Sequence, residues 1–168
     1  MEKDISEVLG KYISKGSKVA ELYHGEKSDI LRSLSDLVGE KGKVYGIDSL
    51  NPFENYKNMA ELKKVKNIDL VSSKMPEILD KIRNLDAIAI REFMFAYEKA
   101  DGAYKPDKKI NSAISSALKN KGYLALVLKG TERNSEDKYQ IYENNIKGYP
   151  DKFNKVYDKG NLLVFQKE

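Results

Sequence analysis

The stretch that decides the fold is residues 37–50, which reads Leu-Val-Gly-Glu-Lys-Gly-Lys-Val-Tyr-Gly-Ile-Asp-Ser-Leu. An amphipathic helical pattern begins at Ser28, a good N-cap, and Gly39 stops it. The short hydrophobic run at residues 43–48 is typical of a buried strand, and it ends in the carboxylate of Asp48. The stretch therefore predicts a helix, a turn and a strand with an acidic residue at its carboxyl end.

The same alternation of strand and helix continues on both sides of this stretch. Five hydrophobic runs predict strands, at residues 18–22, 43–48, 67–72, 85–90 and 123–128. Helical spacing of apolar residues predicts helices at residues 4–14, 28–39, 51–66, 76–82 and 110–118, the last of them ended by Gly122. Residues 98–108 are polar and are expected to form a loop. Because the strands are continuous apolar runs, a parallel sheet covered on both faces is favoured.

The end of the chain follows a different pattern. A helix is expected from Ser135 to about Gly148, and residues 153–157 and 162–166 are expected to pair as an antiparallel hairpin around Gly160. A nicotinamide-binding Rossmann sheet normally ends in parallel strands, so this hairpin distinguishes the chain from that class. With no internal repeat or linker, we expect one domain, with an N-terminal helix in residues 1–16 and an α/β core in residues 17–168.

The composition excludes several classes of site. The chain has 168 residues, is 40% hydrophobic and 33% charged, and balances 30 Lys+Arg against 26 Asp+Glu for a net charge of +4. The signs are interleaved, and the basic run at residues 63–66 is interpreted as the solvated end of a helix, so a nucleic-acid partner is neither supported nor ruled out. Without cysteine there is no disulfide, thiolate nucleophile or sulfur zinc site, and no metal site is predicted.

No targeting signal is visible in the sequence. The N-terminus lacks the apolar run of a signal peptide, and no stretch approaches the length needed to cross a bilayer. We therefore expect a cytoplasmic protein without a membrane partner.

From the first strand to the terminal hairpin, the chain resembles the class I S-adenosylmethionine-dependent methyltransferases. That family has a seven-stranded sheet whose last strand is inserted antiparallel, often with a helix before the first strand. The resemblance implies a three-layer Rossmann-like α/β sandwich with a mostly parallel seven-stranded sheet. It also implies S-adenosylmethionine as the cofactor.

The family places an acidic residue and then alternate glycines after the first strand. Glu21 matches the acidic position and Gly25 the middle glycine, whereas Tyr23 and Lys27 stand at the first and third glycine positions. Lys27 could neutralise the cofactor carboxylate. A tyrosine at a glycine position loses conformational freedom, and this departure leaves open whether the loop binds the cofactor. His24, the only histidine, could act as an acid or base, or be a partly exposed loop residue, which we favour.

The resemblance also assigns residues after the second, third and fourth strands. Asp48, with Ser49 beside it, matches the acidic residue that binds the cofactor ribose, although Asp48 could instead cap the following turn. Ser73 and Met75 are compatible with adenine binding. Arg91 is included in the predicted cofactor site, but an ion pair with Glu92 at the strand end is the favoured alternative.

Three functions are carried forward. The first is an S-adenosylmethionine-dependent methyltransferase whose acceptor, a small molecule or a protein, is not identified and whose catalytic residue is not assigned. The second is a methyltransferase-like protein that has lost activity and serves in binding or assembly, with homo-oligomerisation as one way to complete a site. The third, a nicotinamide-dependent oxidoreductase, lacks the three-glycine fingerprint.

Overall fold

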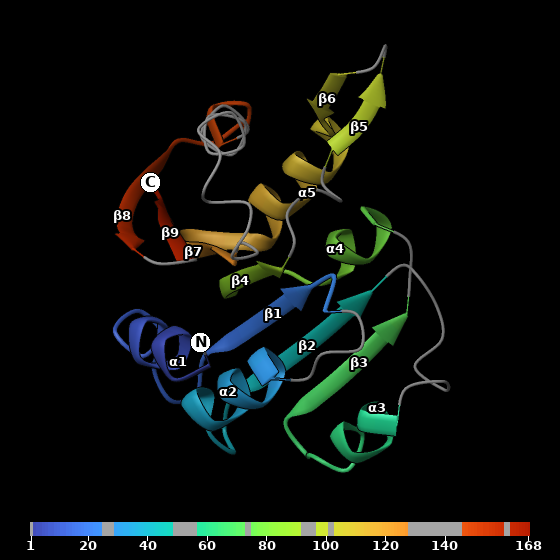
Figure 1. The fold of residues 1–168 in the computed structure, drawn as a ribbon, viewed down its shortest axis with the longest axis vertical. Coiled ribbons are helices and arrows are strands. Elements are labelled where there is room, and N and C mark those ends of the chain that lie inside the picture. The colour runs from blue at the N-terminus through green and yellow to red at the C-terminus, as the bar shows by residue number, and fades with distance from the viewer. Residues whose placement is uncertain are drawn as a thin grey trace.

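A computed structural model describes residues 2–24, 29–48, 57–72, 75–91, 97–100, 103–127, 146–159 and 162–168. Its main feature is a seven-stranded sheet in the order β3-β2-β1-β4-β7-β9-β8 (Figure 1). The strands are β1 (Lys18–Leu22), β2 (Lys43–Asp48), β3 (Ile68–Ser72), β4 (Leu85–Arg91), β7 (Leu118–Val127), β8 (Phe153–Lys159) and β9 (Leu162–Lys167).

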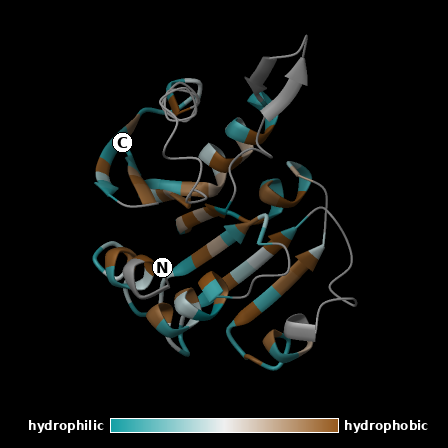
Figure 2. Cartoon of the chain, viewed as in Figure 1, coloured by the Kyte–Doolittle hydropathy of each residue, from teal (hydrophilic) through white to brown (hydrophobic). Residues whose placement is uncertain are grey.

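Helices cover both faces of this sheet. The helices are α1 (Glu2–Leu9), α2 (Asp29–Val38), α3 (Lys57–Leu62), α4 (Glu77–Lys81) and α5 (Lys108–Ala117). Buried residues of α1, α2 and α3 share one hydrophobic cluster with one side of the sheet, and those of α4 and α5 share a second cluster with the other side. Hydrophobic residues accordingly run along the strands (Figure 2). The three-layer arrangement predicted from the sequence is confirmed.

The antiparallel end of the sheet is also confirmed. β9 pairs antiparallel with both β7 and β8, so the last strand of the chain lies between two strands that precede it. The remaining neighbours, β1 with β2 and β4, β2 with β3, and β4 with β7, pair in parallel. β1 and β2 begin and end at the residues expected from their hydrophobic runs.

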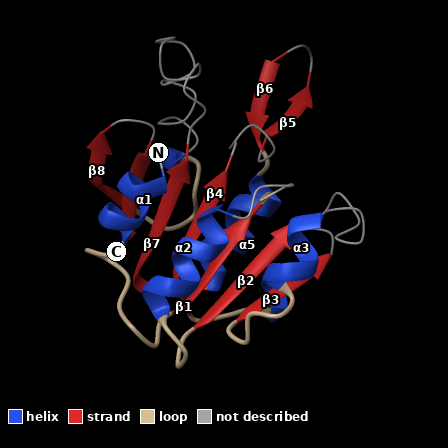
Figure 3. Ribbon diagram, turned by 60° about the horizontal axis from the view of Figure 1, so that its bottom comes forward, coloured by secondary structure: helices blue, strands red, loops and turns tan. Residues whose placement is uncertain are grey.

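Residues 98–108, expected to be a loop, contain a second, two-stranded sheet. β5 (Tyr97–Ala100) and β6 (Ala103–Pro106) pair antiparallel, with Ala100 opposite Ala103. Only Asp101 and Gly102 separate the two strands in the sequence, and Asp-Gly is a favoured hairpin pair. Figure 3 shows this hairpin projecting beyond the large sheet, beside the start of α5.

Several predicted helices are shorter than their apolar spacing indicates. α1 ends at Leu9, although Ile13 is still buried, and α3 begins only at Lys57 within the described residues. α5 ends at Ala117 rather than near Gly122 because Leu118 is already extended and enters β7. The predicted helix from Ser135 lies largely outside the described residues, which resume at Ile146. No helix among the described residues is long and apolar enough to span a membrane.

Candidate functional site

The candidate site lies where the chain order of the sheet reverses. From β1 the chain adds β2 and β3 on one side, and then crosses to place β4 on the other side of β1. In open α/β sheets, ligands bind outside the carboxyl ends of the strands at such a point. Glu21 of β1 lies opposite Ala89 in the register of β1 and β4, so the ends of these strands are side by side.

A buried cluster of charges occupies these strand ends. Arg91, the last residue of β4, donates from Nε to Oε1 of Glu21 at 3.2 Å and from its terminal nitrogen to Oδ1 of Asp29 at the start of α2. The side chains of Arg91 and Glu21 are 7% and 0% exposed. The structure thus brings together Glu21 and Arg91, both predicted site residues, and adds Asp29. Glu92, the partner that we favoured for Arg91, lies outside the described residues.

The burial of Glu21 changes its protonation. Desolvation raises the pKa of this carboxyl from 4.5 to about 8, against the opposing attraction and hydrogen bond of Arg91. The negative charge of Asp29 adds to the rise, and a hydrogen bond with the backbone of Leu31 lowers the pKa slightly. Oε2 of Glu21 is buried and has no hydrogen-bond partner among the described residues. The Glu21 carboxyl therefore holds a proton near neutral pH. Among the described residues, only its Oε1 makes a side-chain hydrogen bond, with Arg91.

Tyr23 adopts the backbone conformation of the glycine that the family has at this position. Its φ is +59°, in the left-handed region that non-glycine residues rarely adopt, and its N–H still donates to the carbonyl of Ile47 at 2.9 Å. The side chain is 9% exposed and belongs to the hydrophobic cluster on the α4/α5 side of the sheet. The backbone therefore bends at Tyr23 directly after β1, and the tyrosine ring is buried in the hydrophobic core.

Asp48 and Asp107 act on the hydroxyl of Tyr23. Burial, together with the negative charges of Asp107 and Asp48, raises the pKa of this hydroxyl to about 12. Asp48 is the last residue of β2 and is 7% exposed. Asp107 is the N-cap of α5, where its side chain accepts hydrogen bonds from two backbone N–H groups. The phenol of Tyr23 thus interacts electrostatically with the carboxylates of Asp48 and Asp107.

His24 is buried and not partly exposed as we expected. It follows the bend at Tyr23 and is only 1% exposed. The left-handed residue before it, Tyr23, turns the chain at the end of β1. Met75 is half-buried and packs against the cluster that contains Tyr23. The predicted site residues Gly25, Lys27, Ser49 and Ser73 lie outside the described residues.

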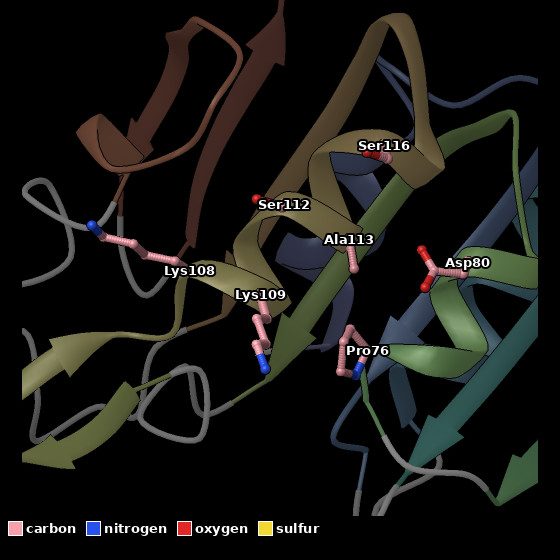
Figure 4. Close-up of a pocket in the computed structure, with 7 residues that line it drawn as sticks. All are labelled: Pro76, Asp80, Lys108, Lys109, Ser112, Ala113 and Ser116. Atoms are coloured by element: carbon pink, nitrogen blue, oxygen red, sulfur yellow. The ribbon is translucent and has the colours of Figure 1, made fainter.

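A groove of about 400 Å³ lies between α4 and α5, and its lining includes none of the predicted site residues. Figure 4 shows Pro76 and Asp80 on one side of it and Lys109 and Ala113 of α5 on the other. Lys108, Ser112 and Ser116 complete its lining. Because it holds one acidic and two basic residues and is wide open, the groove indicates no particular ligand.

Two residues of the site, Asp29 and Asp107, were not predicted from the sequence. Each stands at a helix N-terminus, where an acidic residue has an ordinary structural role. An aspartate that follows proline and precedes a helical run is an available signal for a cap at Asp107, but nothing in the sequence indicates its proximity to Tyr23. Among the described residues, no group of three or more histidine, aspartate or glutamate side chains is placed to hold a metal ion.

Comparison with known proteins places the fold. No family model and no curated protein matches the sequence. Among solved structures, a SAM-dependent methyltransferase from Aquifex aeolicus superposes with a TM-score of 0.71 at 21% identity, over 98% of this chain and 88% of that chain. A putative rRNA-methylase from Clostridium thermocellum gives a TM-score of 0.68 at 16% identity, over 98% and 94%.

A third structure was determined with the cofactor in place. Aeropyrum pernix fibrillarin, in complex with natively bound S-adenosyl-L-methionine, superposes with a TM-score of 0.62 at 15% identity, over 99% of this chain and 74% of that chain. These likenesses span almost the whole chain. The chain therefore has the Rossmann-like fold of the class I S-adenosylmethionine-dependent methyltransferases.

Proposed function

We propose that the chain is an S-adenosylmethionine-dependent methyltransferase. The observation that carries the proposal is Asp48, a buried carboxylate at the carboxyl end of β2, beside a bend at Tyr23 that has glycine-like geometry. The fold places both features at the crevice where open α/β sheets bind ligands. The position of Asp48 and Tyr23 in the sheet and the chemistry of their side chains both support this proposal.

The residues at the crevice fit the proposed cofactor in charge and in hydrogen-bonding capacity. An adenosine ribose offers two hydroxyl donors, and the carboxylate of Asp48 can accept both. The sulfonium and the ammonium of the cofactor are cationic. Glu21, at the end of the neighbouring strand, is a carboxyl whose Oε2 has no partner among the described residues. Acidic groups at adjacent strand ends can therefore bind both the ribose hydroxyls and the cationic groups of the cofactor.

The bound cofactor supplies a methyl group on a positively charged sulfur. Asp48 would hold the ribose, and Arg91 would hold Glu21 in a fixed orientation by bonding its Oε1. Asp29 neutralises the side of Arg91 that faces α2. Since methyl transfer is an in-line displacement, correct placement of the two reactants can supply much of the acceleration. The chain therefore needs no conspicuous acid or base among its described residues.

Calorimetry with S-adenosylmethionine and S-adenosylhomocysteine tests the proposal. We expect a dissociation constant in the micromolar range for the native chain. Asp48→Asn should weaken binding by roughly 10- to 100-fold, since a hydrogen bond to a charged group contributes about 1.5–3 kcal/mol. Asp69→Asn, which alters an exposed carboxylate on β3, should leave affinity unchanged. The absence of any thermal shift at millimolar cofactor would reject the proposal.

One observation favours the second candidate, an inactive binding or assembly protein. The negative charge of Asp48 contributes to the raised pKa of the Tyr23 hydroxyl, and we infer that this side chain competes with a ribose for that carboxylate. Tyr23→Gly separates the candidates when it is measured beside the native chain. Binding only in the variant would show that the ring blocks an otherwise intact site, and binding in the native chain would show that the ring does not abolish binding.

A further inference from the structure

The cluster of Arg91, Glu21 and Asp29 contains more acidic groups than basic ones. A single guanidinium is paired with two carboxyl groups, and the side chains are 7%, 0% and 16% exposed. With both carboxyl groups ionised, the cluster carries one excess negative charge in a buried position. With Glu21 protonated, it is neutral. Burial of an uncompensated charge is costly, so the protonation of Glu21 depends on any further charge brought near it.

Oε2 of Glu21 is the part of the cluster that is left for such a charge. Oε1 is bonded to Arg91, whereas Oε2 has no hydrogen-bond partner among the described residues. The described charged groups that face this carboxyl are Arg91 from β4 and Asp29 from α2, with the backbone of Leu31 as a further hydrogen-bonding group. None of them compensates the second negative charge. Among the described residues, the cluster is thus short of one positive charge.

The methyl donor and its product differ by this charge. S-adenosylmethionine carries a cationic sulfonium, whereas S-adenosylhomocysteine carries a neutral thioether and is otherwise the same molecule. We propose that Glu21 distinguishes the two by charge, because the sulfonium makes Glu21 release its proton to solvent and the thioether does not. This inference rests on the proposed function and concerns the specificity of that same site.

The size of the effect follows from Coulomb's law. A unit positive charge about 8 Å away, at an effective dielectric constant of about 20, lowers a carboxyl pKa by about 1.5. Starting from a pKa of about 8, Glu21 would release about 0.7 proton on binding the sulfonium at pH 7. The donor would thereby gain about fourfold in affinity at pH 7 and about 25-fold at pH 8.5, relative to a carboxyl that stays protonated. The thioether would gain nothing.

Proton release is measured by calorimetry of the native chain in phosphate and in Tris buffer at pH 7. The apparent binding enthalpies in the two buffers differ by the number of protons released, so the measurement does not depend on catalysis. Glu21→Gln is a neutral replacement of the same shape that removes the titrating group. The proton count measured in this variant therefore reports the protons that the ligands themselves release. Glu61→Gln makes the same chemical change at an exposed surface position and is the matched control.

We expect the donor to release about 0.7 proton more from the native chain than from Glu21→Gln. The control variant Glu61→Gln should behave as the native chain does. S-adenosylhomocysteine should show no such difference. Equal proton counts for the donor in the native chain and in Glu21→Gln would overturn the inference while leaving cofactor binding established. Failure of both ligands to bind would instead overturn the proposed function and the inference with it.

A second variant covers the case in which Glu21→Gln does not fold. Asp29→Asn removes a negative charge that favours the protonated form of Glu21. More of Glu21 is then ionised before the donor binds, so the number of protons released at pH 8 should fall below the native value at that pH. An unchanged proton count at pH 8 in Asp29→Asn would also overturn the inference.

Discussion

The raised pKa of Glu21 predicts how the stability of the fold depends on pH. The folded-state pKa of about 8 lies above the unfolded value of 4.5, so the folded chain binds the extra proton between these values. The stabilisation is therefore fully present below pH 4.5 and is lost as pH rises through about 8. Over the whole interval the shift corresponds to roughly 5 kcal/mol at most, and to about 3–4 kcal/mol between pH 5 and pH 8.

Urea unfolding at several values between pH 5 and pH 8 measures this loss. Glu21→Gln removes the titrating group but keeps a polar side chain of similar size, so its free energy of unfolding should fall less over this range than that of the native chain. The two profiles should diverge by about 3–4 kcal/mol. Glu61→Gln, at an exposed ion pair, should follow the native profile. Parallel profiles for Glu21→Gln and the native chain would refute the assignment of a buried, proton-binding carboxyl.

Three substitutions test other parts of the structure by urea unfolding at pH 7. Arg91→Met should cost about 3–5 kcal/mol, because it leaves buried acidic groups without their cation; a loss under 1 kcal/mol would contradict the buried cluster. Gly46→Ala should cost about 1–3 kcal/mol, since a Cβ there would lie 2.8 Å from a methyl carbon of Leu70, and an unchanged stability would contradict this packing. Lys167→Met should cost about 1–3 kcal/mol, because its buried ammonium donates to the carbonyl of Ser115 at 2.7 Å; a neutral result would show that this carbonyl finds another donor.

The layers of the fold could be predicted because its strands are buried on both faces. A strand in this position is a continuous apolar run, and the runs at residues 18–22 and 43–48 coincide with β1 and β2. The terminal hairpin followed from two such runs and a turn between them. These signals are local, and tertiary packing reinforces them.

The errors occurred where local signals compete with tertiary structure. The hairpin at β5 and β6 is short and polar, so no apolar run indicated its strands, although Asp101-Gly102 was an available signal for its turn. The end of α5 was misplaced because the turn-forming Gly122 was interpreted as the helix stop. In the structure, the ammonium of Lys167 donates to the carbonyls of Ser115 and Leu118 where helix gives way to strand. That contact joins residues about 50 positions apart, which no local pattern contains.

The proximity of Glu21 and Arg91 to strand ends was predictable, but the pairing between them was not. Strand ends identified Glu21, Asp48 and Arg91, because polar residues that close buried strands meet at one edge of a parallel sheet. The ion pair between Arg91 and Glu21 depends on β4 lying next to β1, and Asp29 joins it only because α2 starts beside them. Such a cluster follows from strand order and helix placement, both of which lie outside the sequence pattern.

Tyr23 shows why a missing glycine does not exclude a glycine-like bend. A non-glycine residue in the left-handed region costs of order 1–2 kcal/mol, whereas full burial of a large apolar side chain contributes about 1.5–3 kcal/mol. Because the ring is 9% exposed within the core, the two terms are comparable, and the tyrosine can hold the conformation that the family obtains from glycine. Tyr23→Gly would relieve the strain but remove the ring from the core. It should therefore lower the free energy of unfolding while opening space beside Asp48, so stability and cofactor affinity should change in opposite directions. A variant that gained both, or lost both, would contradict this account of the bend.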